Sequence, residues 1–131
     1  MKSINYLVLF VFALTITVSS CKKDTLTPKE MLTAKSWKLS SSKVNGVETI
    51  EDCSKDDIMT FAADGTYSTT VGAITCYVGD INTTGVWTLS SDGKTLTLDS
   101  EDPYSIVITE SKLVVTIVDG TDTIEMTLIP L

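Results

Sequence analysis

The sequence predicts an all-β protein, an antiparallel up-and-down barrel of about eight strands with one short N-terminal helix. Four strong hairpin signals, each an Asn or Asp followed by Gly, support this fold; they are Asn45-Gly46, Asp64-Gly65, Asp92-Gly93 and Asp119-Gly120. Apolar and polar residues alternate between these signals, as in a sheet with one dry and one wet face. A two-sheet sandwich is the alternative, but successive hairpins favour a barrel, whose closure removes exposed edges.

The helix is predicted at the start of this region. Thr27-Pro28-Lys29-Glu30 has the form of a capping box, with Thr at the N-cap, Pro at the first helical position and Glu at the third. Met31, Leu32 and Ala34 then supply an apolar side. We expect a helix from Pro28 to about Ala34, which is too short to be stable alone and should therefore pack on the rest of the domain.

The remainder of the chain has strand character in ten segments, the shortest of which are also compatible with loops. Residues 113–118 are apolar on both faces, which indicates either a central strand or one covered on its outside, for example by the helix. The ten segments are 37–43, 47–50, 58–62, 66–71, 74–78, 85–89, 95–98, 104–109, 112–118 and 123–129.

The first twenty residues have the pattern of a signal peptide. Lys2 supplies a positive charge, and residues 7–18 form an apolar stretch of about 12 residues. This stretch is shorter than the roughly 20 residues that a membrane-spanning helix needs. The expected organisation is therefore a signal peptide at 1–20, a tether at 21–27 and a barrel domain at 28–131.

The end of this segment, Val18-Ser19-Ser20-Cys21, resembles the bacterial lipobox. The resemblance implies cleavage before Cys21, addition of a diacylglycerol to its thiol and acylation, typically with palmitate, of the new amino group. Several acyl chains anchor a protein stably, whereas one chain does so only marginally. Lys22-Lys23-Asp24 lacks the acidic pair associated with retention at the inner membrane, so the resemblance implies the outer membrane of a Gram-negative cell envelope.

The two remaining cysteines, Cys53 and Cys76, are expected to pair. Disulfides are permitted on the exported side of a membrane. A bridge here would close a loop of about 23 residues and stabilise the fold by roughly 3 kcal/mol. Two buried thiols are the alternative.

Composition excludes several classes of function. The formal net charge is −7, with no histidine and no arginine; such a surface repels phosphate backbones, so neither nucleic acid nor anionic headgroups are expected partners of the folded domain. Absence of histidine removes serine and cysteine triads and histidine-ligated metals. The acidic run 51–57 lacks an EF-hand pattern, and we expect a solvated loop there, with weak calcium binding as the alternative. We therefore expect no enzyme, no cofactor and no metal.

One modification motif lies on the tether. Asp24-Thr25-Leu26 resembles the O-glycosylation signal of some Gram-negative secretory pathways, which would make Thr25 the acceptor. The same pattern recurs around Thr123, although the exposed tether is the better site.

Four short motifs resemble the small lipocalin-like lipoproteins of Gram-negative bacteria. They are KSWKL at 35–39, FAADGTY at 61–67, TGVWTL at 84–89 and DGKTL at 92–96. The resemblance implies a lipocalin-type barrel with Trp37 packed at its closed end. The chain departs from the typical pattern at Lys35, where a Gly usually stands, and in lacking the arginines with which related proteins hold a fatty-acid carboxylate.

A barrel of this size can be filled by side chains or can hold one small ligand. Two functions therefore compete: binding of a small apolar or amphipathic molecule inside the barrel, and a non-catalytic structural or adaptor role through contacts with an envelope protein. The candidate ligand-binding residues of the barrel interior are Trp37, Phe61, Tyr67, Trp87, Leu96, Ile106 and Met126.

Overall fold

The computed structural model describes residues 25–131; the predicted signal peptide, the lipobox and Cys21 lie outside the described residues. A six-residue helix precedes nine strands in this part of the chain. The elements are α1 (Pro28–Thr33), β1 (Ser36–Val44), β2 (Val47–Glu48), a 3₁₀ turn (Asp52–Ser54), β3 (Ile58–Phe61), β4 (Thr66–Thr70), β5 (Thr83–Leu89), β6 (Thr95–Leu98), β7 (Tyr104–Ile108), β8 (Leu113–Asp119) and β9 (Asp122–Pro130).

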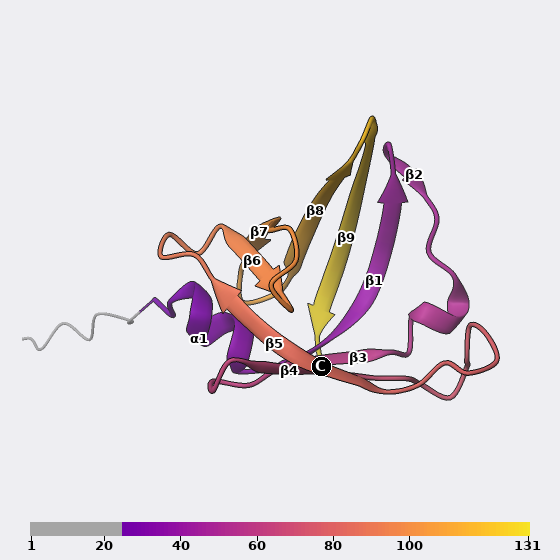
Figure 1. The fold of residues 1–131 in the computed structure, drawn as a ribbon, viewed down its shortest axis with the longest axis horizontal. Helices are drawn as coiled ribbons and strands as arrows, with labels where there is room; N and C mark the ends of the chain where they lie inside the picture. Colours follow the sequence, from indigo (N-terminus) through magenta and orange to yellow (C-terminus); the bar gives the residue numbers. More distant parts are fainter. Residues whose placement is uncertain (1–24) are drawn as a thin grey trace, which may run out of the picture.

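The strands form one antiparallel sheet that closes into a barrel. Each long strand pairs with its successor, and β1 pairs with β9 from Trp37–Pro130 to Val44–Ile124. Figure 1 shows β9 beside β1 at this seam. Eight strands, β1 and β3–β9, make the wall, while β2 is a short extension on the end of β1. The predicted fold class, an antiparallel barrel of about eight strands with one short helix, is confirmed.

The four hairpin signals all lie at turns between paired strands. Asn45 and Gly46 both have positive φ, at 50° and 83°, as a two-residue type I′ turn requires. A fifth turn, which the sequence did not signal, joins β6 to β7: Asp99 and Ser100 have φ of 51° and 63°, and the Glu101 N–H donates to the Leu98 carbonyl over 2.9 Å. Two successive non-glycine residues in this conformation need outside support, which the Asp99 side chain provides, as described below.

The wall of the barrel is uneven in height. β1 and β9 have nine residues each and β8 has seven, whereas β3 and β4 have only four and five. Figure 1 shows β1, β8 and β9 rising well beyond the low side formed by β3 and β4. Two connections, residues 49–57 and 71–82, leave the sheet at this low side. They therefore take the place of strand at the rim.

Helix α1 closes the opposite end. It contacts β3 and β7, which lie four places apart in the ring of eight strands and so face each other across the barrel. The capping box is present as predicted, because the Thr27 hydroxyl accepts from the Glu30 N–H and the Glu30 carboxylate accepts from the Thr27 N–H. Leu32 is fully buried, and its carbonyl accepts the indole N–H of Trp37 over 3.0 Å. A short helix is thus stabilised by plugging a barrel end.

One prediction about elements was wrong, and the structure decides between two alternatives for another segment. Residues 74–78 are not a strand, although their β-branched and aromatic residues have strand character; their backbone N–H groups at Ile74 and Cys76 donate to aspartate side chains instead of a neighbouring strand. The helix does not cover the outer face of β8, where Val118 is exposed. β8 instead lies between β7 and β9, which was the other expectation for this segment.

No helix within residues 25–131 is both long and apolar enough to cross a membrane.

If α1 plugs the barrel, removing its buried side chain should destabilise the whole domain. Leu32→Ala should lower the free energy of unfolding by roughly 2–5 kcal/mol, because the lost methyl groups leave a cavity that the barrel end cannot refill. Leu26→Ala makes the same change on an exposed side chain just before the helix and should cost less than about 0.5 kcal/mol. Urea denaturation measures both, and equal losses would contradict the plug.

Candidate functional site

The interior of the barrel is tightly packed at the helix end and looser at the other. Along six of the eight wall strands, an inward residue nearer α1 is buried and the next one toward the far end is only partly buried. On β1 this step is from Trp37 to Leu39, and on β3 from Phe61 to Met59. The same step separates Leu96 from Leu98, Ile106 from Tyr104, Val115 from Ile117 and Leu128 from Met126.

This looser end holds a cavity of about 340 Å³. That volume lies within the range of about 300–1,000 Å³ typical of small-molecule sites. Its wall is mostly apolar, with polar groups from only four residues, Ser54, Asp57, Thr69 and Tyr104. The apolar lining consists of Trp37, Leu39, Met59, Phe61, Leu96, Leu98, Leu113, Val115, Ile117, Met126 and Leu128. The site can therefore take up an apolar body and offer hydrogen bonds at one end.

Four of the seven interior residues predicted from the sequence line this cavity: Trp37, Phe61, Leu96 and Met126. Trp87 and Ile106 are buried outside the cavity lining. Trp87 packs edge-on against Phe61, with ring centroids 5.8 Å apart, and its indole N–H donates to the Ala62 carbonyl over 3.0 Å. Trp87 is thus placed as packing of the barrel wall rather than cavity lining.

Tyr67, the seventh, also faces inward but is held by an internal hydrogen bond. Its hydroxyl donates to an Asp99 carboxylate oxygen over 2.6 Å, and the other oxygen accepts from the Val86 N–H over 2.8 Å. Gly85 makes room for this arrangement, because a Cβ there would overlap the Asp99 carboxylate. These bonds fix the strained β6–β7 turn against β4 and β5.

The hydrogen bond between Tyr67 and Asp99 shifts the pKa values of the two side chains in opposite directions. The hydrogen bond from Tyr67, followed by that from the Val86 N–H, lowers the pKa of Asp99. The same bond to Asp99, followed by burial, raises the pKa of Tyr67 to about 12. The bonded form, neutral tyrosine with ionised aspartate, is therefore favoured across the physiological range of pH.

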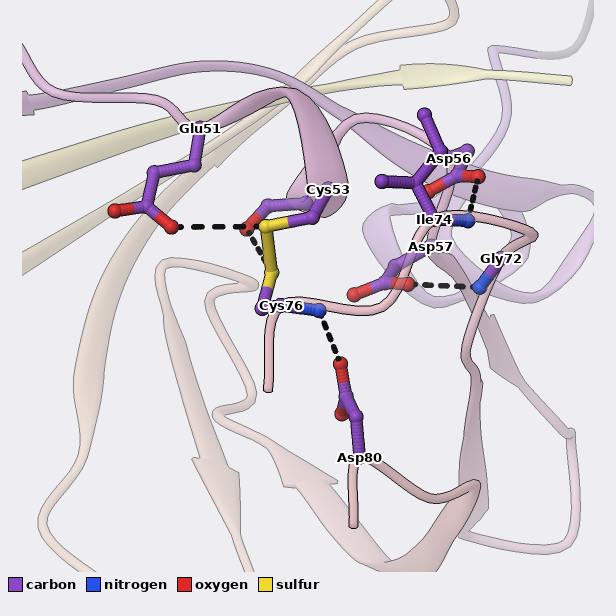
Figure 2. Close-up of a disulfide and its surroundings, with 9 residues drawn as sticks. Glu51, Cys53, Asp56, Asp57, Gly72, Ile74, Cys76 and Asp80 are labelled. Carbon is purple, nitrogen blue, oxygen red and sulfur yellow. Dashed lines mark hydrogen bonds between the residues drawn. A yellow bond between two sulfur atoms is a disulfide. The ribbon is translucent and has the colours of Figure 1, made fainter. Parts of the chain in front are cut away.

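The 49–57 loop contributes to the cavity lining, and a disulfide joins this loop to the 71–82 loop. Cys53 in the 3₁₀ turn is bonded to Cys76 in the 71–82 loop, which confirms the predicted pair (Figure 2). Ser54, next to this bond, lines the cavity. A tie across 23 residues limits how far the two loops can separate, in the folded protein as well as in the unfolded chain.

The acidic residues of this region act as acceptors for the loop backbone. Asp57 accepts from the Gly72 N–H over 2.9 Å and Asp56 from the Ile74 N–H over 3.0 Å, as Figure 2 shows. Asp80 accepts from the Cys76 N–H over 3.1 Å. These side chains satisfy backbone groups that have no partner strand. They explain why an irregular loop with strand-like composition is held in place.

The carboxylates of the 51–57 run do not converge on a cation site. Asp52 pairs with Lys55, while Asp56 and Asp57 bind separate backbone N–H groups. Within residues 25–131, the one group of potential metal ligands comprises Glu51, Cys53 and Cys76. The two cysteines form the disulfide, so neither offers a thiolate.

Thr25, the predicted glycosylation site, is exposed.

Sequence reasoning missed several cavity residues, above all Asp57. Residues 57, 59 and 61 alternate toward the interior along β3 and the residue before it, so the period that selected Phe61 also places Asp57 inside. Its position within an acidic run concealed this signal. Tyr104 and Leu98 could be found by the same alternation on β7 and β6.

Comparison with known families agrees with this architecture. The family model described as "Lipocalin-like domain" matches residues 33–115, from the end of α1 into β8. The chain therefore belongs to the lipocalin-like domain family. No curated protein matches the sequence closely enough to add a relative.

The Tyr67–Asp99 bond predicts a stability that depends on pH. Tyr67→Phe should lower Tm by about 5 °C at pH 7, since it removes a hydrogen bond to a charged group. Because the pKa of Asp99 is lowered in the folded state, this contribution is present above its unfolded value near 3.9 and is lost as pH falls through the folded value.

Thermal melts at pH 7 and in strong acid measure this difference. Tyr77→Phe, on the exposed part of the 71–82 loop, is the matched control and should leave Tm within about 1 °C at either pH. A Tyr67→Phe deficit that stays equal in acid would show that the bond to ionised Asp99 is not its cause.

Proposed function

We propose that this protein is a lipid-anchored, non-catalytic binding protein that holds one small apolar or amphipathic molecule inside its barrel. The carrying observation is the cavity of about 340 Å³ lined almost wholly by apolar side chains. Such a cavity in a closed barrel favours apolar ligands, because water binds weakly to its wall and an apolar molecule makes better contact with it. At roughly 30 Å³ for each heavy atom, a ligand of about ten heavy atoms would fill it.

A retained opening also supports a binding function. A barrel of eight strands can be filled completely by its own side chains, and the end nearest α1 is filled in this way. The other end is not, although the same strands continue and supply inward residues such as Leu39 and Met126. The cavity lies next to loops tied by a disulfide, so its mouth has a defined edge.

The anchor at Cys21 and the location at the outer membrane are part of this proposal and rest on the sequence. The lipobox-like Val18-Ser19-Ser20-Cys21 follows an apolar segment of signal-peptide length. The tether then enters the domain at α1, the closed end of the barrel. A lipid at Cys21 would therefore attach the closed end to the membrane through a few residues and leave the mouth at the far end.

The 71–82 loop favours a second candidate function, an adaptor that contacts another envelope protein. Ile74, Tyr77, Val78 and Ile81 are all exposed on this loop. Grouped apolar side chains on a surface often mark an interaction site. A co-purifying protein together with an empty barrel would favour this function over ligand binding.

Filling the cavity should abolish ligand binding without unfolding the protein. In isothermal titration calorimetry with decanol, Ile117→Trp should weaken affinity at least tenfold, because the larger side chain occupies the mouth of the cavity. Val118→Trp introduces the same side chain on the exposed face of β8 and should stay within about twofold of the original chain. Absence of decanol binding to the unaltered protein, or equal loss in both variants, would contradict the proposal.

The anchor is tested separately. Cys21→Ala should yield protein that carries no lipid and retains residues 1–20, because both processing and acylation require the thiol. A double variant, Cys53→Ser with Cys76→Ser, controls for loss of cysteine and should remain lipidated. Intact mass spectrometry distinguishes these forms, and a Cys21→Ala product still bearing acyl chains would refute the anchor.

A further inference from the structure

The ligand proposed above would meet a carboxylate at the mouth of the cavity. Asp57 immediately precedes β3, whose inward residues Met59 and Phe61 line the same cavity. The alternation along this segment directs the Asp57 side chain toward the interior. The inference that follows rests on the proposed ligand binding and concerns the chemical class of the ligand.

Asp57 has one oxygen available for a ligand. Its Oδ1 accepts from the Gly72 N–H over 2.9 Å, which fixes the orientation of the carboxylate, as Figure 2 shows. Oδ2 receives no hydrogen bond from the residues of the described chain. The ion pair found within residues 25–131 joins Lys55 to Asp52, so no described lysine neutralises Asp57.

The other polar groups of the cavity are uncharged at neutral pH. Ser54 and Thr69 contribute hydroxyls, and Tyr104 contributes a ring whose hydroxyl donates to Glu101 over 3.3 Å. Burial, followed by the nearby Glu101, raises the pKa of Tyr104, which keeps this hydroxyl protonated. No lysine lines the cavity, and the chain has no arginine. The cavity thus presents a single formal charge, and that charge is negative.

We propose that the cavity selects small amphipathic amines, that is, molecules with an apolar body and a cationic head, over the corresponding carboxylic acids. The apolar body lies among the side chains nearer α1, and the ammonium group donates to Asp57 Oδ2 at the mouth. A charge-assisted hydrogen bond of this kind is about twice as strong as a neutral one. A carboxylate head would instead be placed beside a like charge that has no neutralising partner, which disfavours it.

Three probes with the same ten-carbon chain test this selection: decylamine, decanol and decanoate, each below its micelle-forming concentration. Calorimetric titration of the purified full chain at pH 7.5 should rank them amine, alcohol, acid. The amine should bind at least tenfold more tightly than decanoate. Because this ranking is measured on the unaltered protein, it does not depend on the folding of any variant.

Asp57→Asn then assigns the selection to one residue. The amide oxygen can still accept from the Gly72 N–H, so the loop keeps its anchor while the charge is lost. The ratio of amine to decanoate affinity should fall to within about threefold of unity. Glu110→Gln removes the same charge in the β7–β8 turn at the closed end and should leave the ratio at its original value, which controls for net charge.

The outcomes separate this inference from the proposed function. If decanol binds but decylamine and decanoate bind equally, or if Asp57→Asn leaves their ratio intact, the cavity binds ligands and the selection for amines is wrong. If none of the three probes binds, the proposed function fails and the selection fails with it. A ratio lost equally in Glu110→Gln would assign the preference to overall charge and overturn the role of Asp57.

Discussion

Pairing of β1 with β9 is the constraint on which the rest of the structure depends. This ladder joins the first and last strands of the chain and turns a succession of local hairpins into a closed wall. Closure satisfies the edge groups of both strands, which would otherwise be open to pairing with another chain. It also forces one face of every strand inward. The register shift between Leu39 and Ser41 lets β1 bend to meet both neighbours.

The two ends of the closed barrel differ in how they are covered. At one end α1 spans from β3 to β7, and the residues Leu32, Trp37 and Leu113 are completely shielded from solvent. At the other end the short strands β3 and β4 leave the wall incomplete, and two loops joined by the Cys53–Cys76 disulfide complete it. Stability is therefore concentrated around the plug, while the cavity can remain unfilled without loss of the fold. This separation of core from cavity supports the proposed binding function.

Much of this architecture could be predicted from local sequence patterns. The Asn-Gly and Asp-Gly pairs located four turns, the period of two assigned the faces of the strands, and the capping box located α1. These features depend on residues close together in the chain. The Asp99-Ser100 turn could not be found in this way, because its backbone is held by Tyr67 and Val86 from other strands. The strand prediction for residues 74–78 failed for a similar reason, since the distant Asp56 and a disulfide help to fix their conformation.

Whether an inward side chain fills the core or lines a cavity is also a long-range property. Trp37 on β1 and Trp87 on β5 both face inward, yet the first lines the cavity and the second does not, because the plug and the neighbouring Phe61 determine the space beside each ring. The most direct test of the account is native mass spectrometry of protein freshly extracted from its own membranes. The account predicts a small molecule bound in a one-to-one ratio and released on gentle activation. A chain that repeatedly emerges without any such molecule, while small apolar probes also fail to bind it, would contradict the account.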